Sequence, residues 1–166
     1  DSLLAYLPIL PSILILLFII LLGIIFDIIG ISVTSADPAP FHSMASRKVF
    51  GAKRAIELIK NADKVSNFCN DVIGDIASII SGATVAAIIA QISLTYSITN
   101  TIWISLMMTS LAASLTVGGK ALGKTVAILK SKEIIFVVAR IISTFDMIGK
   151  KDGRKNSYGK NSRFDK

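Results

Sequence analysis

Cysteine and histidine each occur once in the sequence, as Cys69 and His42. A disulfide within the chain is therefore excluded, and no His/Cys cluster for zinc is present. The sequence also lacks a Walker loop, a dinucleotide-binding fingerprint and a nucleophile elbow. We expect that the chain is not an enzyme, that His42 is a surface residue, and that Cys69, among apolar neighbours, packs without reacting.

Charge is missing from residues 2–26 and again from residues 76–119. With 52% hydrophobic residues and a mean hydropathy of +0.67, this composition is typical of membrane proteins and rare in soluble domains. The first run exceeds the about 20 apolar residues that a helix needs to cross the hydrocarbon core. It is longer than the core of a signal peptide and follows no basic region, so we expect a membrane span over about residues 3–32.

The second uncharged run is too long for one span. As a single helix it would be about twice as long as the hydrocarbon core is thick. The polar sequence SITN at 97–100 favours a tight turn inside the run. Two further spans are therefore predicted, over about residues 67–96 and 101–119, with Trp103 as an interfacial anchor near the outer end of the third.

Basic residues gather beside the apolar runs. Residues 41–64 combine Lys and Arg with apolar residues at helical spacing, which is typical of an amphipathic helix on a membrane surface. The sequence SADPAP at 35–40 separates this helix from the first span, because each proline disfavours helix in the residue before it. Residues 132–148 are too short to span and are predicted as a second surface helix, and residues 150–166 as a disordered basic tail.

These patterns predict an all-α membrane protein, with one transmembrane domain over residues 1–149. It has three transmembrane helices, a basic juxtamembrane helix and a belt helix on the cytoplasmic side. The net charge of +7 lies in the flanks of the spans, which favours contact with the lipid bilayer over nucleic acid. Because Lys and Arg are enriched on the cytoplasmic side, we expect a multi-pass protein of the cell membrane, with its amino terminus outside and its carboxyl terminus in the cytoplasm.

The order of these parts resembles the membrane domain of the CNNM/CorC magnesium transporters. FDIIGISVTSAD at 26–37 is similar to the end of the family's first span. The stretch at 44–78, MASRKVFGAKRAIELIKNADKVSNFCNDVIGDIAS, is similar to its surface helix and second span, and GKALGKTVAILKSKEIIFVVA at 119–139 to the end of its third span. The resemblance covers about residues 3–148 and rests on this order of segments. It implies a divergent, homodimeric member without the regulatory CBS pair.

The resemblance also implies an ion site, which the family builds from serines, asparagines and a glutamate around a dehydrated Mg²⁺. Here Asp27 stands at the first-span serine position, Asn70 and Asp71 align with second-span asparagines, and Lys120 stands at the third-span glutamate. The candidates for an ion site or an intramembrane pair are Asp27, Thr34, Asn70, Asp71, Asp75, Ser78 and Lys120. Mg²⁺ is the implied ion, with Asp27, Asn70 and Asp71 as its candidate ligands, because it prefers oxygen donors. A nearby ammonium would repel it.

Three interpretations of Lys120 stay open. The lysine can snorkel to the headgroups, in which case Asp71 and Asp75 are solvent-exposed residues at the end of the second span. It can instead point into the bundle and pair with Asp27, Asp71 or Asp75, so that its ammonium takes the place of the bound cation. Lastly, these acids can form a working cation site.

Two functions follow from these interpretations. One is transport or efflux of a divalent, Mg²⁺-like cation through an altered ion site. The other is a transport-inactive structural or regulatory membrane subunit with the same fold. The small residues on the spans favour close helix packing, so a homodimer is expected, and a further membrane or cytoplasmic partner is compatible with either function.

Overall fold

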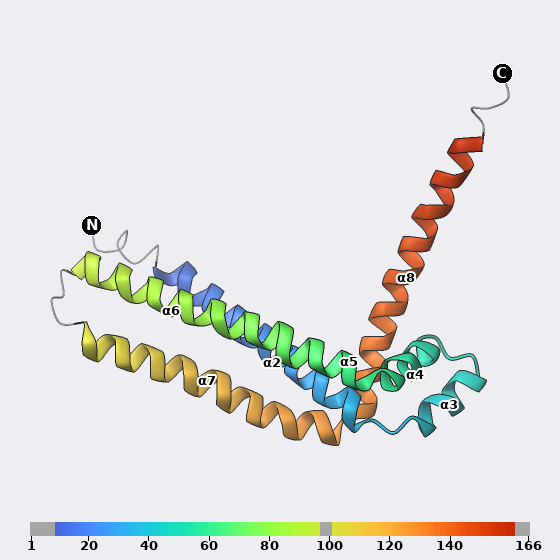
Figure 1. Cartoon of the computed structure of the whole chain (residues 1–166), viewed down its shortest axis with the longest axis horizontal. Helices are drawn as coiled ribbons and strands as arrows, with labels where there is room; N and C mark the ends of the chain where they lie inside the picture. The colour runs from blue at the N-terminus through green and yellow to red at the C-terminus, as the bar shows by residue number, and fades with distance from the viewer. Residues whose placement is uncertain (1–8, 97–100, 162–166) are drawn as a thin grey trace.

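Three long helices lie side by side along the molecule (Figure 1). The computed structural model describes the backbone of residues 9–96 and 101–161, and the side chains of residues 9–95 and 101–148. The long helices are α2 (Ile9–Ser35), α6 (Gly74–Tyr96) and α7 (Ile102–Leu129). Three stretches of the described chain, Ile9–Ser35, Ala62–Thr95 and Ile102–Leu129, are long and apolar enough to cross a membrane. The prediction of an all-α membrane protein is confirmed.

The spans differ from their predicted limits mainly at the third helix. α2 ends at Ser35, just before the proline-rich stretch, and α7 begins at Ile102. α7 continues past the predicted end at 119 to Leu129. Gly119 and Gly123 let this part of α7 approach α2 closely, since a Cβ on Gly123 would lie 2.8 Å from Ile28 Cγ1. The predicted turn at 97–100 lies outside the described residues.

The single surface helix predicted over residues 41–64 is wrong. The structure has two short helices there, α3 (Ala39–Ser46) and α4 (Ala52–Lys60). Between them Lys48 has φ 57° and Gly51 has φ 89°, both in the left-handed region, which a continuous right-handed helix cannot contain. The two helices therefore fold back beside each other at one end of the bundle (Figure 1).

The second span begins earlier than α6 itself. α5 (Ala62–Asn67) continues through the π-helical segment η1 (Phe68–Ile73) into α6 without a break. A π-helix adds a residue to the turn, so it rotates the side chains that follow it relative to a regular helix. This segment carries two of the candidate site residues, Asn70 and Asp71.

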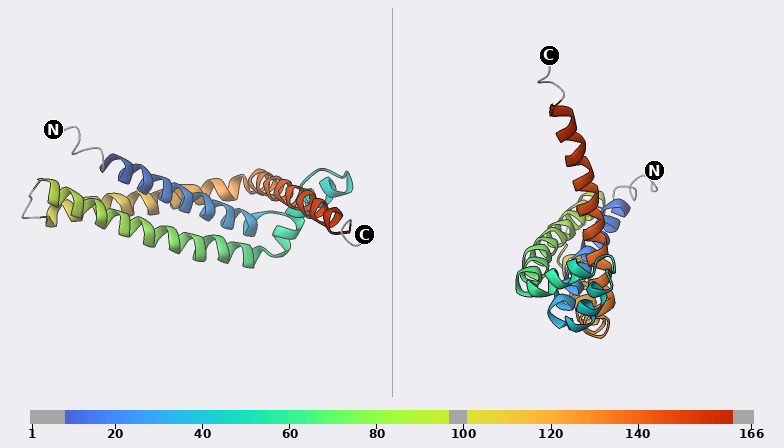
Figure 2. Two further views of the ribbon diagram at one scale, coloured as in Figure 1. Left: turned by 90° about the horizontal axis from the view of Figure 1, so that it is seen from above. Right: turned by 90° about the vertical axis from the view of Figure 1, so that its right-hand side faces the viewer.

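The last helix crosses the end of the bundle instead of joining it. α8 (Ser131–Asn161) rises away from the three long helices in Figure 1 and in the right-hand view of Figure 2. Its backbone runs past the predicted surface helix at 132–148 and into the stretch predicted as a disordered tail, where no proline interrupts it. Residues 162–166 lie outside the described part of the chain.

Two apolar clusters hold these elements together. One lies within the three long helices and includes Leu16, Ile20, Val85 and Ile88. The other joins the end of α2 to α3, α4 and α8 and is built around Val33, Phe41, Ala55, Ile135 and Ala139. Phe41 is fully buried, so the second cluster fixes the short helices against the bundle. Many large apolar side chains on the outside of the long helices stay exposed, as expected of surfaces that face lipid.

Candidate functional site

An ion pair lies where the three long helices meet. Lys120 Nζ, on α7, is 3.9 Å from Asp27 Oδ1, on α2. The two side chains are 29% and 15% exposed, respectively. Gly74, the first residue of α6, packs against the ammonium of Lys120, because a Cβ there would lie 3.5 Å from Lys120 Nζ. All three long helices therefore contribute to the surroundings of the pair. At 3.9 Å the contact is electrostatic and longer than a hydrogen bond.

Small residues bring these two charges together. Gly119 and Gly123, on either side of Lys120, allow the α7 backbone to lie against Ile24 and Ile28 of α2. One turn further along, Ser32 Oγ donates a hydrogen bond to the Ala127 carbonyl, at 3.2 Å and fully buried. The lysine is thus held by packed helices on both sides.

The other acids of the candidate set stay apart from Lys120. Asp71 and Asp75 are both exposed, and within the described residues the ion pair of Lys120 is with Asp27. Thr34 is exposed and its hydroxyl donates to Ile31 O at 2.9 Å, and the Ser78 hydroxyl donates to Gly74 O at 2.8 Å. Both hydroxyl protons therefore bond to the backbone of their own helix.

Asn70 has an unusual environment. Its Nδ2 donates to Ser66 Oγ at 3.1 Å, whereas its Oδ1 is buried and has no hydrogen-bond partner among the described atoms. The amide lies against Gly30 of α2, where a Cβ would come 2.8 Å from Asn70 Cγ. Gly30 is one turn from Asp27, so the unpartnered oxygen and the ion pair share a face of α2. Leaving such an oxygen unsatisfied costs roughly 1–3 kcal/mol.

These oxygens make a poor site for Mg²⁺. The ion needs near-octahedral oxygen coordination, usually with one or two carboxylates. Of the three proposed ligands, Asp27 already faces the ammonium of Lys120, and Asp71 is exposed. Among these ligands, only Asn70 provides a buried oxygen, Oδ1, that has no partner in the described part of the chain. No group of three or more His, Cys, Asp and Glu able to hold a metal occurs in the described part of the chain. With Lys120 charged, the residues fit an internal pair better than a bound cation.

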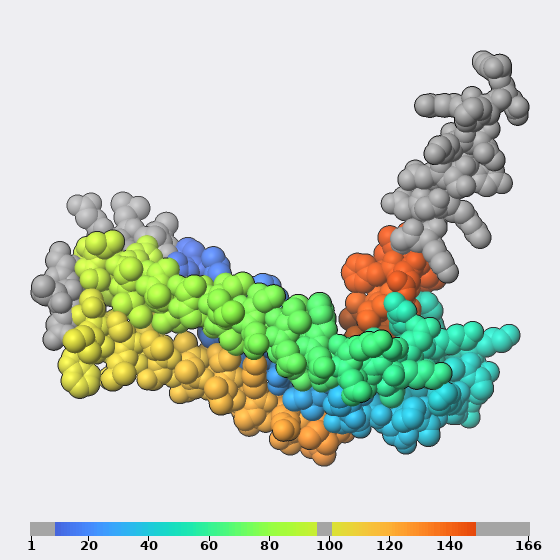
Figure 3. All heavy atoms as spheres, in the orientation of Figure 1, coloured from blue at the N-terminus to red at the C-terminus, as the bar shows by residue number. Residues whose placement is uncertain are grey.

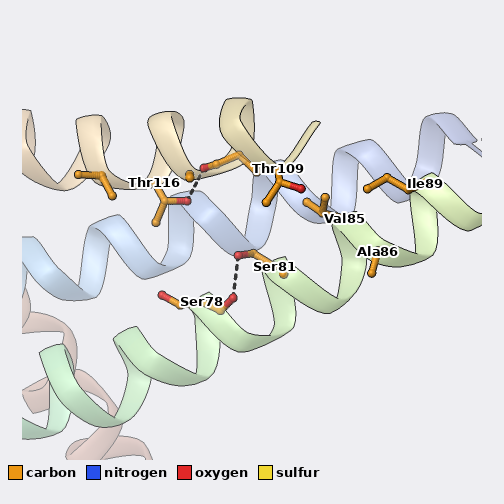
Figure 4. Close-up of a pocket in the computed structure, with 11 residues that line it drawn as sticks. Ser78, Ser81, Val85, Ala86, Ile89, Thr109 and Thr116 are labelled. Atoms are coloured by element: carbon orange, nitrogen blue, oxygen red, sulfur yellow. Dashed lines mark hydrogen bonds between the residues drawn. The ribbon is translucent and has the colours of Figure 1, made fainter. Parts of the chain in front are cut away.

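A groove lies between α6 and α7, and neither Lys120 nor Asp27 belongs to its lining. It has a volume of about 310 Å³, and its lining includes Ser78, Ser81, Thr109 and Thr116 (Figure 4). The hydroxyls of Ser81 and Thr116 donate to Ser78 O and Ala112 O, so their protons are bound within their own helices. The remaining space beside Lys120 is only about 10 Å³, roughly room for one water. The groove is thus a lateral recess that packing separates from the charged pair.

A second ion pair joins α4 to α8 outside the spans. Arg54 Nη1 lies 2.6 Å from Glu57 Oε2, and its Nη2 lies 3.3 Å from Asp146 Oδ2. The hydrogen bond that Arg54 donates to Glu57, followed by the charge of Asp146, raises the pKa of the Arg54 guanidinium. All three side chains are well exposed, so the two contacts of Arg54 contribute little to the stability of the fold. The contact with Asp146 mainly orients α8 relative to α4.

Comparison of the chain with protein-family models, with curated proteins and with solved structures finds no match. Among the residues singled out earlier, His42 and Trp103 are exposed and Cys69 is buried. Sequence inspection missed three contacts: Asn70 with Gly30, Ser32 with Ala127, and Arg54 with Asp146.

Proposed function

We propose that the chain is a membrane-embedded structural or regulatory subunit with a CNNM/CorC-like arrangement of helices, in which a fixed ammonium replaces the transported cation. The observation that carries this proposal is the distance of 3.9 Å between Lys120 Nζ and Asp27 Oδ1. By resemblance, these positions belong to the ion site of the transporters. An ammonium tethered there neutralises the carboxylate and repels a divalent ion.

Assembly through the groove between α6 and α7 belongs to this proposal. The groove is lined by small residues, including Gly82, Ala86, Ala112 and Ala113, which let helices approach closely in a membrane. A second copy of the chain is the partner that the resemblance implies. The proposed orientation keeps α3, α4 and α8 in the cytoplasm, because Lys and Arg are concentrated there.

Transport of a divalent cation is the second candidate. The buried, unpartnered Oδ1 of Asn70 favours it, because a cation would satisfy this oxygen. Asn70 and Asp27 would then be the cation ligands that this chain retains at the positions of the family's ion site. For this to happen, Lys120 must swing away from Asp27 or lose its proton.

Metal-dependent thermal stability separates the two functions. The full-length protein, purified in neutral detergent, is unfolded by heat with and without millimolar MgCl₂, alongside Lys120→Met and Lys120→Glu. For a subunit with a fixed ammonium, Mg²⁺ leaves the melting temperature of the parent protein unchanged, and only Lys120→Glu gains from the ion. A clear Mg²⁺-dependent rise in the parent protein that exceeds the rise with KCl at equal ionic strength would favour transport.

Lys124→Met is the matched control for these variants. Lys124 lies one turn along the same helix but is exposed and forms no ion pair in the described residues. Its removal changes the charge of α7 equally, so an effect common to both lysines reports net charge. An effect confined to Lys120 reports the pair with Asp27.

A further inference from the structure

A basic cavity lies outside the spans, between α3, α4 and α8. Its volume is about 330 Å³, and the residues that line it include Lys48, Phe50, Lys53, Arg54 and Ser143. The loop that forms its rim is held by backbone hydrogen bonds from Lys48 N to Ala45 O and from Val49 N to Met44 O, both 3.0 Å. The cavity is therefore part of a defined loop conformation.

The shape of this loop depends on two left-handed residues. Gly51, with φ 89°, packs against α8: a Cβ there would lie 3.3 Å from the backbone nitrogen of Arg140. Lys48, with φ 57°, is the one non-glycine residue of the described chain with positive φ. Lysine rarely adopts this conformation, and backbone strain of this kind gathers where side chains serve a ligand. Lys48 is exposed and belongs to the lining of the cavity.

The charges around the cavity leave an excess of cations. The two nearby acids, Glu57 and Asp146, are both engaged by Arg54. Lys48 and Lys53 form no ion pair within the described residues. The two free ammonium groups are donors suited to a phosphate group.

The surroundings identify the source of that phosphate as a lipid. α8 crosses the end of the bundle of candidate spans, so it lies along the membrane surface when the three long helices cross the bilayer (Figures 1 and 2). Its outer face carries Val137, Ile141, Phe145 and Ile148, each more than half exposed. In Figure 3 this helix rises beside the α3–α4 end of the molecule. This outer face lies across α8 from the cavity and suits contact with the membrane surface, whereas the exposed Phe50 lies in the cavity lining together with the two free lysines.

We propose that the cavity between α3, α4 and α8 binds the headgroup of an anionic phospholipid. Lys48 and Lys53 contact the phosphate, and the acyl chains lie against the exposed ring of Phe50, which lines the same cavity. The site fixes the depth of the short helices at the membrane surface. This inference does not depend on whether the ion pair in the bundle has replaced a transported cation.

Lipid titration of the purified full-length protein tests the proposal. Phosphatidylglycerol, phosphatidylcholine or inorganic phosphate is added to the protein in neutral detergent, and bound lipid is counted by native mass spectrometry. We expect saturable binding of phosphatidylglycerol. The variant Lys48→Asn/Lys53→Gln should weaken it roughly 25-fold, because each lysine near an anionic headgroup contributes a factor of about five. Asparagine tolerates the left-handed conformation at 48, so this variant keeps the loop.

The control variant is Lys130→Gln/Lys132→Gln, which removes the same charge from exposed residues where α7 meets α8. It should bind phosphatidylglycerol like the parent protein. Equal losses in the two double variants would mean attraction by net charge alone and would overturn the site. Equal binding of phosphatidylcholine, or competition by millimolar inorganic phosphate, would overturn the assignment to an anionic lipid headgroup. Circular dichroism of each variant checks that helix content is retained.

Discussion

The side-chain amide of Asn70 lies directly against Gly30 of α2, with no space for a methyl group between them. This contact joins the π-helical segment η1 of the second span to the last two turns of α2, the first span. It places the buried, unpartnered Oδ1 of Asn70 one turn from Asp27. The position of Gly30 is thus set by a polar neighbour and not by backbone conformation, since its φ is not positive.

Gly30→Ala should destabilise the protein by about 1–3 kcal/mol, because an added methyl group must displace the Asn70 amide. The measurement is thermal unfolding of the purified variant, followed by circular dichroism. Gly118→Ala is the control: a Cβ at Gly118, which is also helical, meets no atom within 4 Å. Combining Gly30→Ala with Asn70→Ala should recover part of the loss. An unchanged melting temperature for Gly30→Ala would refute the contact.

Ser32→Ala should destabilise the protein by about 1–3 kcal/mol. The Ala127 carbonyl lies near the end of α7, where backbone acceptors lack partners within the helix, and Ser32 Oγ supplies its bond at 3.2 Å. Chemical denaturation in detergent gives the free-energy change. Ser46→Ala is the control, because that hydroxyl is exposed and bonds to Ser43 O nearby in sequence. Equal effects of the two variants would show that the bond between α2 and α7 contributes nothing specific.

The helices were predictable from the sequence because their signal is long and strong. Runs of uncharged residues exceed the length of a membrane span, and the prolines after Ser35 end α2 where proline chemistry requires it. The break between α3 and α4 was not predictable in the same way. It depends on left-handed conformations at both Lys48 and Gly51; the glycine favours that conformation, but a lysine gives no sequence signal for it.

The candidate site was predictable only in part. Charged residues inside apolar surroundings stand out, so Asp27 and Lys120 could be chosen before their distance was known. Which acid lies near Lys120 depends on the relative rotation of three helices, and the π-helical segment changes that rotation for Asn70 and Asp71. The close approach of Gly30 to Asn70 depends on the same rotation, so spacing along the chain did not reveal it.

The two ends of the bundle should lie on opposite sides of the membrane. In a Cys69→Ser background, Thr95→Cys and Ser46→Cys place single thiols at exposed positions near the end of α6 and at the end of α3. An impermeant maleimide added to intact cells should label only Thr95→Cys, because basic segments stay in the cytoplasm. Permeabilised cells provide the control for reactivity at Ser46→Cys. Labelling of both thiols in intact cells would contradict the three-span topology.

The Lys120–Asp27 pair should behave as a coupled unit. Lys120→Met and Asp27→Asn should each cost about 3 kcal/mol, at the low end for a buried pair, because both side chains keep some exposure. The double variant should cost clearly less than the sum, since neither charge is then left alone. Exchanging the charges, as Asp27→Lys/Lys120→Asp, should restore part of the stability if the contact is electrostatic.

The parent protein, the two single variants and the double variant form a double-mutant cycle, and thermal unfolding in detergent and in lipid nanodiscs measures the stability of each. Lys124→Met, which removes an exposed lysine of the same helix, should change the free energy of unfolding by less than about 0.5 kcal/mol. If the two single variants add without coupling in both environments, Lys120 and Asp27 act independently. The lysine then reaches the headgroups alone, and the proposal that its ammonium stands in for a cation fails, because that role requires the carboxylate of Asp27 as its partner.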